Sequence, residues 1–238
     1  MEETIAVENL REVREVFDIN KINFWLDSGT LLGAVRDGKI IEWDADVDLR
    51  IWYKNATKLI STFPEFKKRG FDVLLSKKRA GLTIIRFGVE ITVGLFHKRG
   101  DYAWNVWVLH GKSVEKILNR LVNISNMRTY AKQEGTFARK IKYFSSLLPL
   151  NVKQLMTNIA WLLLYSLDCM VPIVIPKHYF EKLSTIQFYG MQFNIPSDTE
   201  KYLKYRYGTN WKTPIKEWVY YKDDGAITPD WDVLHFKT

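Results

Sequence analysis

Hydrophobic and polar positions follow two different periods in the first hundred residues. From Glu3 to Ile19 the apolar residues recur at helical spacing with Glu and Arg between them, which predicts an amphipathic helix packed on a core. Phe24-Trp25-Leu26 is a short apolar run typical of a strand. Residues 31–35 (LLGAV) then suit a short helix, and Arg36-Asp37-Gly38 ends it.

The same patterns predict further elements along the chain. A helix is expected from Ala56 to Phe63, with Pro64 at its end, and another from Ser113 to about Gln133. Strands are expected at Phe71–Leu75, Leu82–Phe87, Gly88–Leu95 and Tyr102–Leu109.

The C-terminal third contains a predicted β-hairpin and a predicted helix. The hairpin runs from Phe188 to Ile195 and turns at Gly190. Asp198 is expected to cap the helix that carries Tyr202 and Leu203, because a short polar side chain can satisfy the free amides of a first turn.

Leu155 to Ile175 is the most hydrophobic run in the chain and is about long enough to span a bilayer. Asn158, Asp168 and Pro172 interrupt it, and an ionisable residue in mid-membrane is costly. The pattern therefore favours a helix that is buried or lies on a membrane surface, with a spanning helix as the less favoured alternative.

Acidic and apolar residues alternate between Trp43 and Leu49. In a strand, side chains two apart share a face, so Asp44, Asp46 and Asp48 are expected to point one way and Val47 and Leu49 into a core. Like charges on one face repel, and a divalent cation such as Mg²⁺ or Mn²⁺ would offset that cost. The alternative is an acidic surface turn that binds nothing.

The turn upstream of these carboxylates strengthens the metal interpretation. Gly29 and Thr30 precede a predicted helix, where exposed backbone N–H groups and a hydroxyl can hold a phosphate group. Asp27 is expected to cap this turn or helix.

The composition limits the classes of binding partner but does not select one class. The 238 residues carry a net charge of +8, which fits a nucleotide, a phosphorylated glycan, an anionic membrane surface or nucleic acid, or a diffuse solvated face. A single cysteine, Cys169, excludes an internal disulfide and a cysteine-based zinc site. The acidic start of the chain has no apolar segment typical of a signal peptide, so a cytoplasmic location is expected.

Two motifs in the central stretch match a known family. Residues 29–36 (GTLLGAVR) are followed by Trp43, Asp44, Asp46 and Asp48, and this combination resembles the LicD/fukutin family. The segment from Pro176 to Pro214 also resembles the tail of that family. The resemblance implies an α+β fold: a nucleotidyltransferase-like mixed sheet flanked by helices, with a helical C-terminal part. We expect one domain over residues 1–238, with its core at about 20–110 and helical and tail elements at 111–238.

The resemblance further implies a phosphotransferase that moves a phospho-alcohol, such as phosphocholine or ribitol phosphate, from a CDP-activated donor to a glycan or lipid-linked saccharide acceptor. Asp46 and Asp48 would then hold Mg²⁺ or Mn²⁺, and Asp44 would be a ligand or a support for one. Gly29 and Thr30 would hold the phosphate.

Two further site residues come from the same resemblance. The family carries a third carboxylate on a later strand, usually Asp, and here Glu90 occupies that place. Glu90 would complete the metal site and accept the proton of the acceptor hydroxyl, or it is an exposed strand residue. Arg36 would bind the diphosphate, or it pairs with a carboxylate and fixes the turn.

Two rival functions remain at this stage. One is a nucleotidyltransferase that acts on another acceptor, and the other is a non-catalytic member that serves as a glycan-binding scaffold. Specific nucleic-acid binding is not expected, whereas peripheral membrane contact fits a lipid-linked acceptor.

Overall fold

The computed structural model describes residues 1–75, 81–108 and 170–228, together with Pro149, Val152, Leu155, Ile159 and Leu234. The chain forms two compact units, one made of Met1–Trp107 and Pro172–Thr238 and the other of Val108–Val171. The second unit lies almost entirely outside the described residues. The first unit joins both ends of the chain, so its core draws on the C-terminal third as well as on the predicted residues 20–110.

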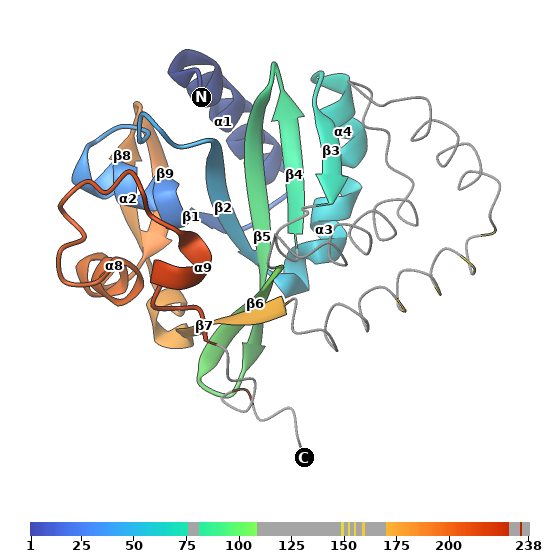
Figure 1. The fold of residues 1–238 in the computed structure, drawn as a ribbon. Helices are drawn as coiled ribbons and strands as arrows, with labels where there is room; N and C mark the ends of the chain where they lie inside the picture. Colours follow the sequence, from blue (N-terminus) through green and yellow to red (C-terminus); the bar gives the residue numbers. More distant parts are fainter. Residues whose placement is uncertain are drawn as a thin grey trace, which may run out of the picture. The chain divides into compact units, whose positions relative to one another are not determined.

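A seven-stranded mixed sheet forms the centre of the first unit, and five of its strands lie in the order β1-β2-β5-β4-β3 (Figure 1). Strands β2 and β5 are parallel, while β1–β2, β5–β4 and β4–β3 are antiparallel. The far end of β5 pairs with β6, which pairs with β7. The strands are β1 (Phe24–Leu26), β2 (Asp46–Trp52), β3 (Asp72–Leu75), β4 (Gly81–Arg86), β5 (Val89–Arg99), β6 (Tyr102–Val108) and β7 (Met170–Pro176).

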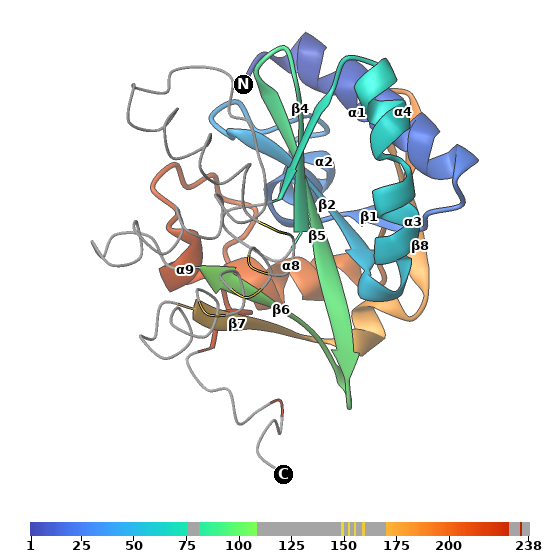
Figure 2. The same cartoon turned by 90° about the vertical axis from the view of Figure 1, so that its right-hand side faces the viewer.

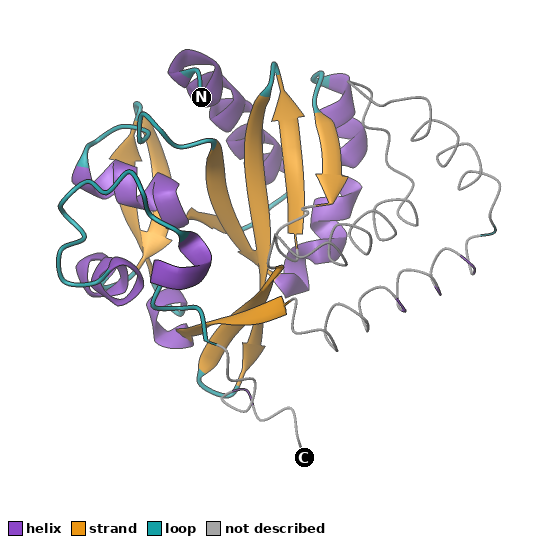
Figure 3. Cartoon of the chain, in the orientation of Figure 1, coloured by secondary structure: helices purple, strands orange, loops and turns teal. Residues whose placement is uncertain are grey.

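A separate hairpin and several helices flank the sheet (Figure 3). In the side view, α1, α3 and α4 lie on one side of the sheet and α9 on the other (Figure 2). The predicted mixed sheet with flanking helices is thus confirmed. The remaining elements are β8 (Leu183–Phe188), β9 (Met191–Pro196), α1 (Glu3–Ile19), α2 (Ser28–Arg36), α3 (Ala56–Ser61), α4 (Phe63–Lys68), α8 (Thr199–Tyr207), α9 (Tyr220–Asp223) and the 3₁₀ turns η1 (Tyr53–Asn55) and η2 (Lys177–Phe180).

Helix α1 has the predicted bounds because both its start and its apolar face are encoded locally. The Glu2 carboxylate accepts hydrogen bonds from the N–H groups of Thr4 and Ile5 and so caps the helix. Leu10, Val13, Val16 and Phe17, among others, are fully buried. The Phe17 ring packs edge-on against Phe24 and Phe66, with centroids 5.2 and 6.0 Å apart, which ties α1 to β1 and α4.

Two predicted helices differ from the structure. The helix expected from Ala56 to Phe63 ends at Ser61, and a second helix, α4, begins at Phe63 with Pro64 in its first turn. The N–H groups in the first turn of a helix have no partner within the helix, so the missing N–H of proline costs nothing there. Pro64 therefore lies at the start of a helix and does not end one. In the run from Leu155 to Ile175, which was expected to be helical, residues 170–175 belong to strand β7, and β7 pairs with β6. Several of these residues are β-branched, which favours a strand.

The rest of that hydrophobic run lies mostly outside the described residues, as does the helix expected from Ser113 to Gln133. Among the described residues, no helix is long and apolar enough to cross a membrane. The buried and membrane-surface interpretations of 155–169 therefore stay predictions.

A hairpin with its turn at Gly190 is confirmed, but it runs from Leu183 to Pro196 and so begins before the predicted start at Phe188. Tyr189 and Gly190 both have positive φ, 50° and 71°, as a tight hairpin turn with right-handed twist requires. Asp198 precedes α8 as predicted, but the capping role was wrong. Its own φ is 48° and its carboxylate makes no cap hydrogen bond, lying instead 3.5 Å from Nζ of Lys201.

Replacing Gly94 should destabilise the sheet through a side chain on the neighbouring strand. A Cβ at position 94 would lie 2.0 Å from Nη1 of Arg50, which is fully buried and cannot move into solvent. Gly94→Ala is therefore expected to lower the free energy of unfolding by about 1–3 kcal/mol in urea titrations. Ser184→Ala, on an exposed strand position, should change it by less than about 0.5 kcal/mol. Equal stabilities of the two variants would contradict this packing.

Candidate active site

The pairing of β2 with β5 brings the predicted carboxylates together at one end of the sheet. In the parallel register Asp46 lies opposite Glu90, and Asp48 lies opposite Thr92. Val47 and Leu49, between and after the two aspartates, are fully buried. The strand therefore separates an acidic face from an apolar face, as its alternation predicts.

Hydrogen bonds from three directions hold this acidic face in place. The Oγ1 of Thr30 accepts a hydrogen bond of 2.8 Å from the Asp48 N–H, and the Asp27 N–H donates one of 3.1 Å to the Asp48 carbonyl. The Thr92 hydroxyl donates to Asp46 Oδ2 at 3.1 Å. The Thr30 hydroxyl is thus buried and directed at β2, where it supports Asp48. This geometry gives no support to the contact with a phosphate that was predicted for Thr30.

Asp46 and Asp48 border a cavity of about 480 Å³ that also receives the first residues of α2. Ser28 and Gly29 form part of the same wall, so the start of α2 and two carboxylates line one space. The other wall is rich in aromatic rings and includes the ammonium group of Lys216, 5.2 Å from the Trp43 ring centroid. The lining rings belong to Trp43, Trp107, Tyr207, Trp211, Trp218 and Tyr220.

A side chain at position 29 would displace Asp44, which lies against Gly29. A Cβ on Gly29 would be 2.1 Å from Asp44 Oδ2. Asp44 Oδ1 in turn accepts a hydrogen bond of 2.9 Å from the Ala45 N–H. Asp44 therefore lies on the cavity wall beside the start of α2, as well as beside the two strand aspartates.

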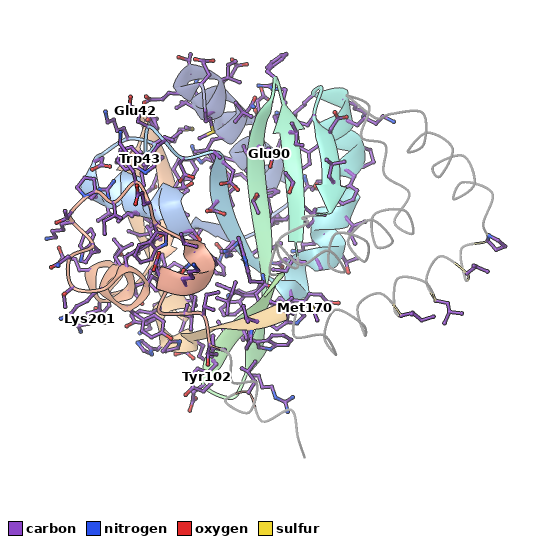
Figure 4. The ribbon with its side chains drawn as sticks, viewed as in Figure 1. Glu42, Trp43, Glu90, Tyr102, Met170 and Lys201 are labelled. Carbon is purple, nitrogen blue, oxygen red and sulfur yellow. The ribbon has the colours of Figure 1, made fainter. Side chains whose placement is uncertain are left out.

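Arg36 and Glu90 are placed differently from Asp44, Asp46 and Asp48. Arg36 lines the cavity but donates two hydrogen bonds, of 2.8 and 2.7 Å, to the Asp37 carboxylate, which is the turn-fixing role considered from sequence. Glu90 is exposed on β5 beside Asp46 in register and is not part of the cavity lining (Figure 4). Within residues 1–75, 81–108 and 170–228, no three acidic, histidine or cysteine side chains are grouped closely enough to hold a metal ion by themselves.

Behind the cavity lies a network of four buried charged side chains, which we call the buried charge network: Asp27, Arg50, Arg206 and Asp224. All four side chains are fully buried. Arg206 donates from Nε to Asp224 at 2.7 Å, and its Nη1 lies 3.3 Å from Asp27 Oδ1. The Nε of Arg50 lies 2.8 Å from Asp27 Oδ2, at an angle that makes an ion pair without a hydrogen bond.

The buried charge network reaches the cavity wall through hydroxyl groups. Ser28 Oγ lies 3.4 Å from Nη2 of Arg50 and 3.5 Å from Nη2 of Arg206. Arg206 also donates to the Tyr220 hydroxyl at 3.0 Å. The two walls of the cavity are therefore joined behind it. The helix-capping role predicted for Asp27 was wrong, since its side chain makes no cap hydrogen bond and instead joins these ion pairs.

The network sets the ionisation of Asp27. Burial by itself raises the pKa of Asp27, but the charges of Arg206 and Arg50 and a hydrogen bond from the Tyr202 hydroxyl outweigh it, so the pKa lies below its usual value. Burial is also the main cause that raises the pKa of Tyr202 well above 10. Asp27 is consequently a buried anion matched by two buried cations.

Sequence reasoning missed the aromatic wall and the buried charge network. Tyr207 and Trp211 lie in the segment from Pro176 to Pro214 that resembles the tail of the family, and the sequence assigned them no role. One signal was available for Arg50, because a charged residue inside an apolar strand is rarely buried without a partner. No signal could pair Asp27 with Arg206, which are 179 residues apart.

Removing one member of the buried charge network should strongly destabilise the fold. Asp224→Asn leaves the Arg206 guanidinium with an uncompensated buried charge, so the free energy of unfolding should fall by about 3–5 kcal/mol in urea titrations. The matched control is Glu200→Gln, which removes an exposed ion pair with Lys212 and should cost under about 1 kcal/mol. A similar, small effect of both changes would show that the buried pairs do not stabilise this fold.

The lowered pKa of Asp27 predicts a dependence of stability on acid. The folded-state pKa lies below the unfolded value near 3.9, so the stabilisation is complete above about pH 4 and is lost as pH falls through the folded-state pKa. Stability of the wild type measured between pH 5 and pH 2 should therefore fall more steeply than that of Asp27→Asn. Asp101→Asn, at an exposed position, should keep the wild-type slope.

Comparison with known proteins supports the family that the motifs indicate. Residues 21–128 match the model described as LicD/FKTN/FKRP, nucleotidyltransferase domain. The ribitol-5-phosphate transferase FKTN of Homo sapiens is 23% identical over 230 residues, which cover 89% of this chain and 34% of that protein. The ribitol 5-phosphate transferase FKRP of Homo sapiens is 46% identical over 48 residues, or 20% of this chain and 10% of that protein.

An uncharacterized protein of Rickettsia typhi is 32% identical over 92 residues, 39% of this chain and 28% of that protein. The alignments thus span about a third or less of these curated relatives. Among solved structures, ANT(2")-Ia in complex with adenylyl-2"-tobramycin matches with a TM-score of 0.32 and 12% identity, over 65% of this chain and 96% of that one. The family match contains Asp44, Asp46, Asp48 and Glu90, so residues 21–128 of this chain are similar to the LicD/FKTN/FKRP family of nucleotidyltransferase domains.

Proposed function

We propose that this protein is a metal-dependent transferase that moves a phospho-alcohol from a CDP-activated donor to a glycan or glycolipid acceptor. One observation carries the proposal: Asp46 and Asp48 share a cavity with the N-terminus of α2, inside a segment that matches a nucleotidyltransferase domain family. The FKTN and FKRP relatives are ribitol-phosphate transferases by name, which supports this chemical class. The candidates for the transferred group are choline phosphate, ribitol phosphate and glycerol phosphate.

The residues at the cavity fit Mg²⁺ or Mn²⁺. Hard divalent ions prefer carboxylate oxygens, and Mg²⁺ is commonly bound by one or two carboxylates together with phosphates of the substrate. Asp46 and Asp48 offer that number on one strand face, with Asp44 beside the start of α2. When bound, the ion would neutralise charge on the donor phosphates during transfer.

The chain itself would position the donor. Phosphoryl transfer requires in-line placement and charge stabilisation more than a covalent nucleophile. The start of α2, at Ser28 and Gly29, would bind phosphate oxygens. Thr30 and Asp27 keep Asp48 at a fixed distance from that helix end through their hydrogen bonds to its backbone.

Glu90 and the aromatic wall would serve the acceptor and the organic part of the donor. Glu90, exposed beside Asp46, would accept the proton of the acceptor hydroxyl. The exposed ring of Trp43 offers a face for stacking on a nucleobase or a sugar. Lys216 supplies a positive charge to the same wall.

Ligand-dependent stability tests this proposal directly. Thermal unfolding would be followed with Mn²⁺ or Mg²⁺ and CDP-choline, CDP-ribitol, CDP-glycerol, CTP, ATP or UDP-sugars. One CDP-alcohol should raise stability only when metal is present, by about 2.7 kcal/mol at a hundredfold excess over Kd. No shift with any nucleotide would instead favour a glycan-binding scaffold, and a shift with every nucleoside triphosphate would favour a general nucleotidyltransferase.

Asp48→Asn should abolish this metal-dependent shift while the variant stays folded. Turnover with the donor so identified should fall by at least about a hundredfold, because the ion loses a carboxylate ligand. Asp72→Asn, an exposed position on β3, is the matched control and should behave as wild type. Full activity of Asp48→Asn would show that the metal assignment is wrong.

A further inference from the structure

A second hollow lies at the opposite end of β2 from the carboxylates. It has a volume of about 510 Å³, within the range of ligand-binding sites. Three lysines line it: Lys21 from the α1–β1 turn, Lys54 from η1 and Lys98 from the end of β5. We call this site the lysine hollow. It shares no lining residue with the cavity that contains Asp46 and Asp48.

The floor of the lysine hollow is rigid and apolar. Trp52 and Phe180 form part of its lining, and both are almost fully buried. Their rings lie 5.9 Å apart in an edge-on contact, and both pack against the buried Trp25, at 5.5 and 5.1 Å. The shape of this floor is therefore set by the core and does not depend on a ligand.

The charge of the lysine hollow is strongly unbalanced. Among the described residues, Lys21, Lys54 and Lys98 form no ion pair, and the Lys98 ammonium lies 4.5 Å from the Trp52 ring centroid. The lining holds one carboxylate, Glu181, whose Oε1 lies 4.0 Å from Nζ of Lys177 outside the hollow. Three ammonium groups around one hollow repel one another, and an anionic ligand would relieve that cost.

Amide side chains add hydrogen-bonding groups suited to a hydroxyl-rich ligand. Asn194 donates to Asn23 Oδ1 at 3.1 Å and to the Phe24 carbonyl at 3.0 Å, which fixes both amides at the edge of the hollow. The Asn23 amide N–H groups donate no hydrogen bond within the described residues and remain exposed. Ammonium groups recognise phosphate, while amides and an aromatic floor suit the hydroxyl groups and rings of a saccharide.

The position of the lysine hollow indicates a polymer. Asp46 and Trp52 mark the two ends of β2, whose seven residues span about 20 Å at about 3.3 Å per residue. One small molecule cannot reach both sites, whereas a chain can bind the hollow with one unit and present another unit to the carboxylates. Such a second contact raises the effective concentration of the reacting unit.

We infer that the lysine hollow binds a phosphate-bearing saccharide or polyol chain, at a site separate from the transfer chemistry. Identifying that chain with the acceptor rests on the proposed function, but the binding site itself does not. A concave site of this volume fits a chain segment better than a flat bilayer, which would contact protruding residues.

The direct test is equilibrium binding of poly(glycerol phosphate) chains to the full protein at low and moderate salt. The triple variant Lys21→Gln, Lys54→Gln, Lys98→Gln should bind about tenfold more weakly at low salt, as expected for the loss of three exposed charge contacts. Its affinity should also depend less on salt, because fewer ions are displaced. The control variant Lys67→Gln, Lys68→Gln, Lys201→Gln removes the same charge from other exposed positions and should stay within about twofold of wild type.

Equal losses in both triple variants would overturn the inference, since binding would then follow net charge alone. It would also be overturned if the hollow variant lost binding to vesicles of anionic phospholipid but kept wild-type affinity for the polymer. The Asp48→Asn protein separates the two proposals, because it should lose the metal-dependent donor shift and still bind the polymer. Polymer binding by the hollow without any donor shift in wild type would refute the proposed function and leave this site standing.

Discussion

The buried charge network behind the cavity is the constraint on which the rest of the site depends. Asp27 lies between β1 and α2, Arg50 lies in β2, Arg206 lies in α8 and Asp224 follows α9. The four side chains are fully buried together. Two anions and two cations balance within this network. Because each ion pair joins different elements, the sheet, the start of α2 and the C-terminal segment must be correctly placed at the same time.

This network explains why a site built from motifs that are close in sequence also depends on the C-terminal segment. The aspartates of β2 and the first turn of α2 are close in sequence, and Thr30 and Asp27 join them through backbone hydrogen bonds to Asp48. The aromatic wall facing them comes largely from residues 207–220. Arg206, through its contacts with Tyr220 and Ser28, couples that wall to the helix end. The chemistry proposed for the front of the cavity therefore relies on the charges behind it.

Much of the fold could be predicted because the signals are local. The bounds of α1 and β1, the acidic and apolar faces of β2 and the turn at Gly190 follow from side-chain period, capping and backbone conformation. The family match agrees with the recognised motifs and includes the predicted carboxylates. Expectations were wrong where one residue type can serve two purposes: Pro64 begins a helix, Asp198 does not cap one, and Asp27 exchanges a cap for ion pairs.

By itself, the sequence determined which residues share a strand face, where most of the described elements begin, and that Asp46 and Asp48 would stand together beside a helix start. Only the tertiary structure decided that Thr30 supports Asp48, that Arg36 pairs with Asp37 and that Arg206 reaches Asp27. It also placed three lysines around one hollow at the far end of β2. The physical reason is that periodicity and capping act over one or two turns of chain, whereas the partner of a buried charge is set by packing between segments far apart in sequence.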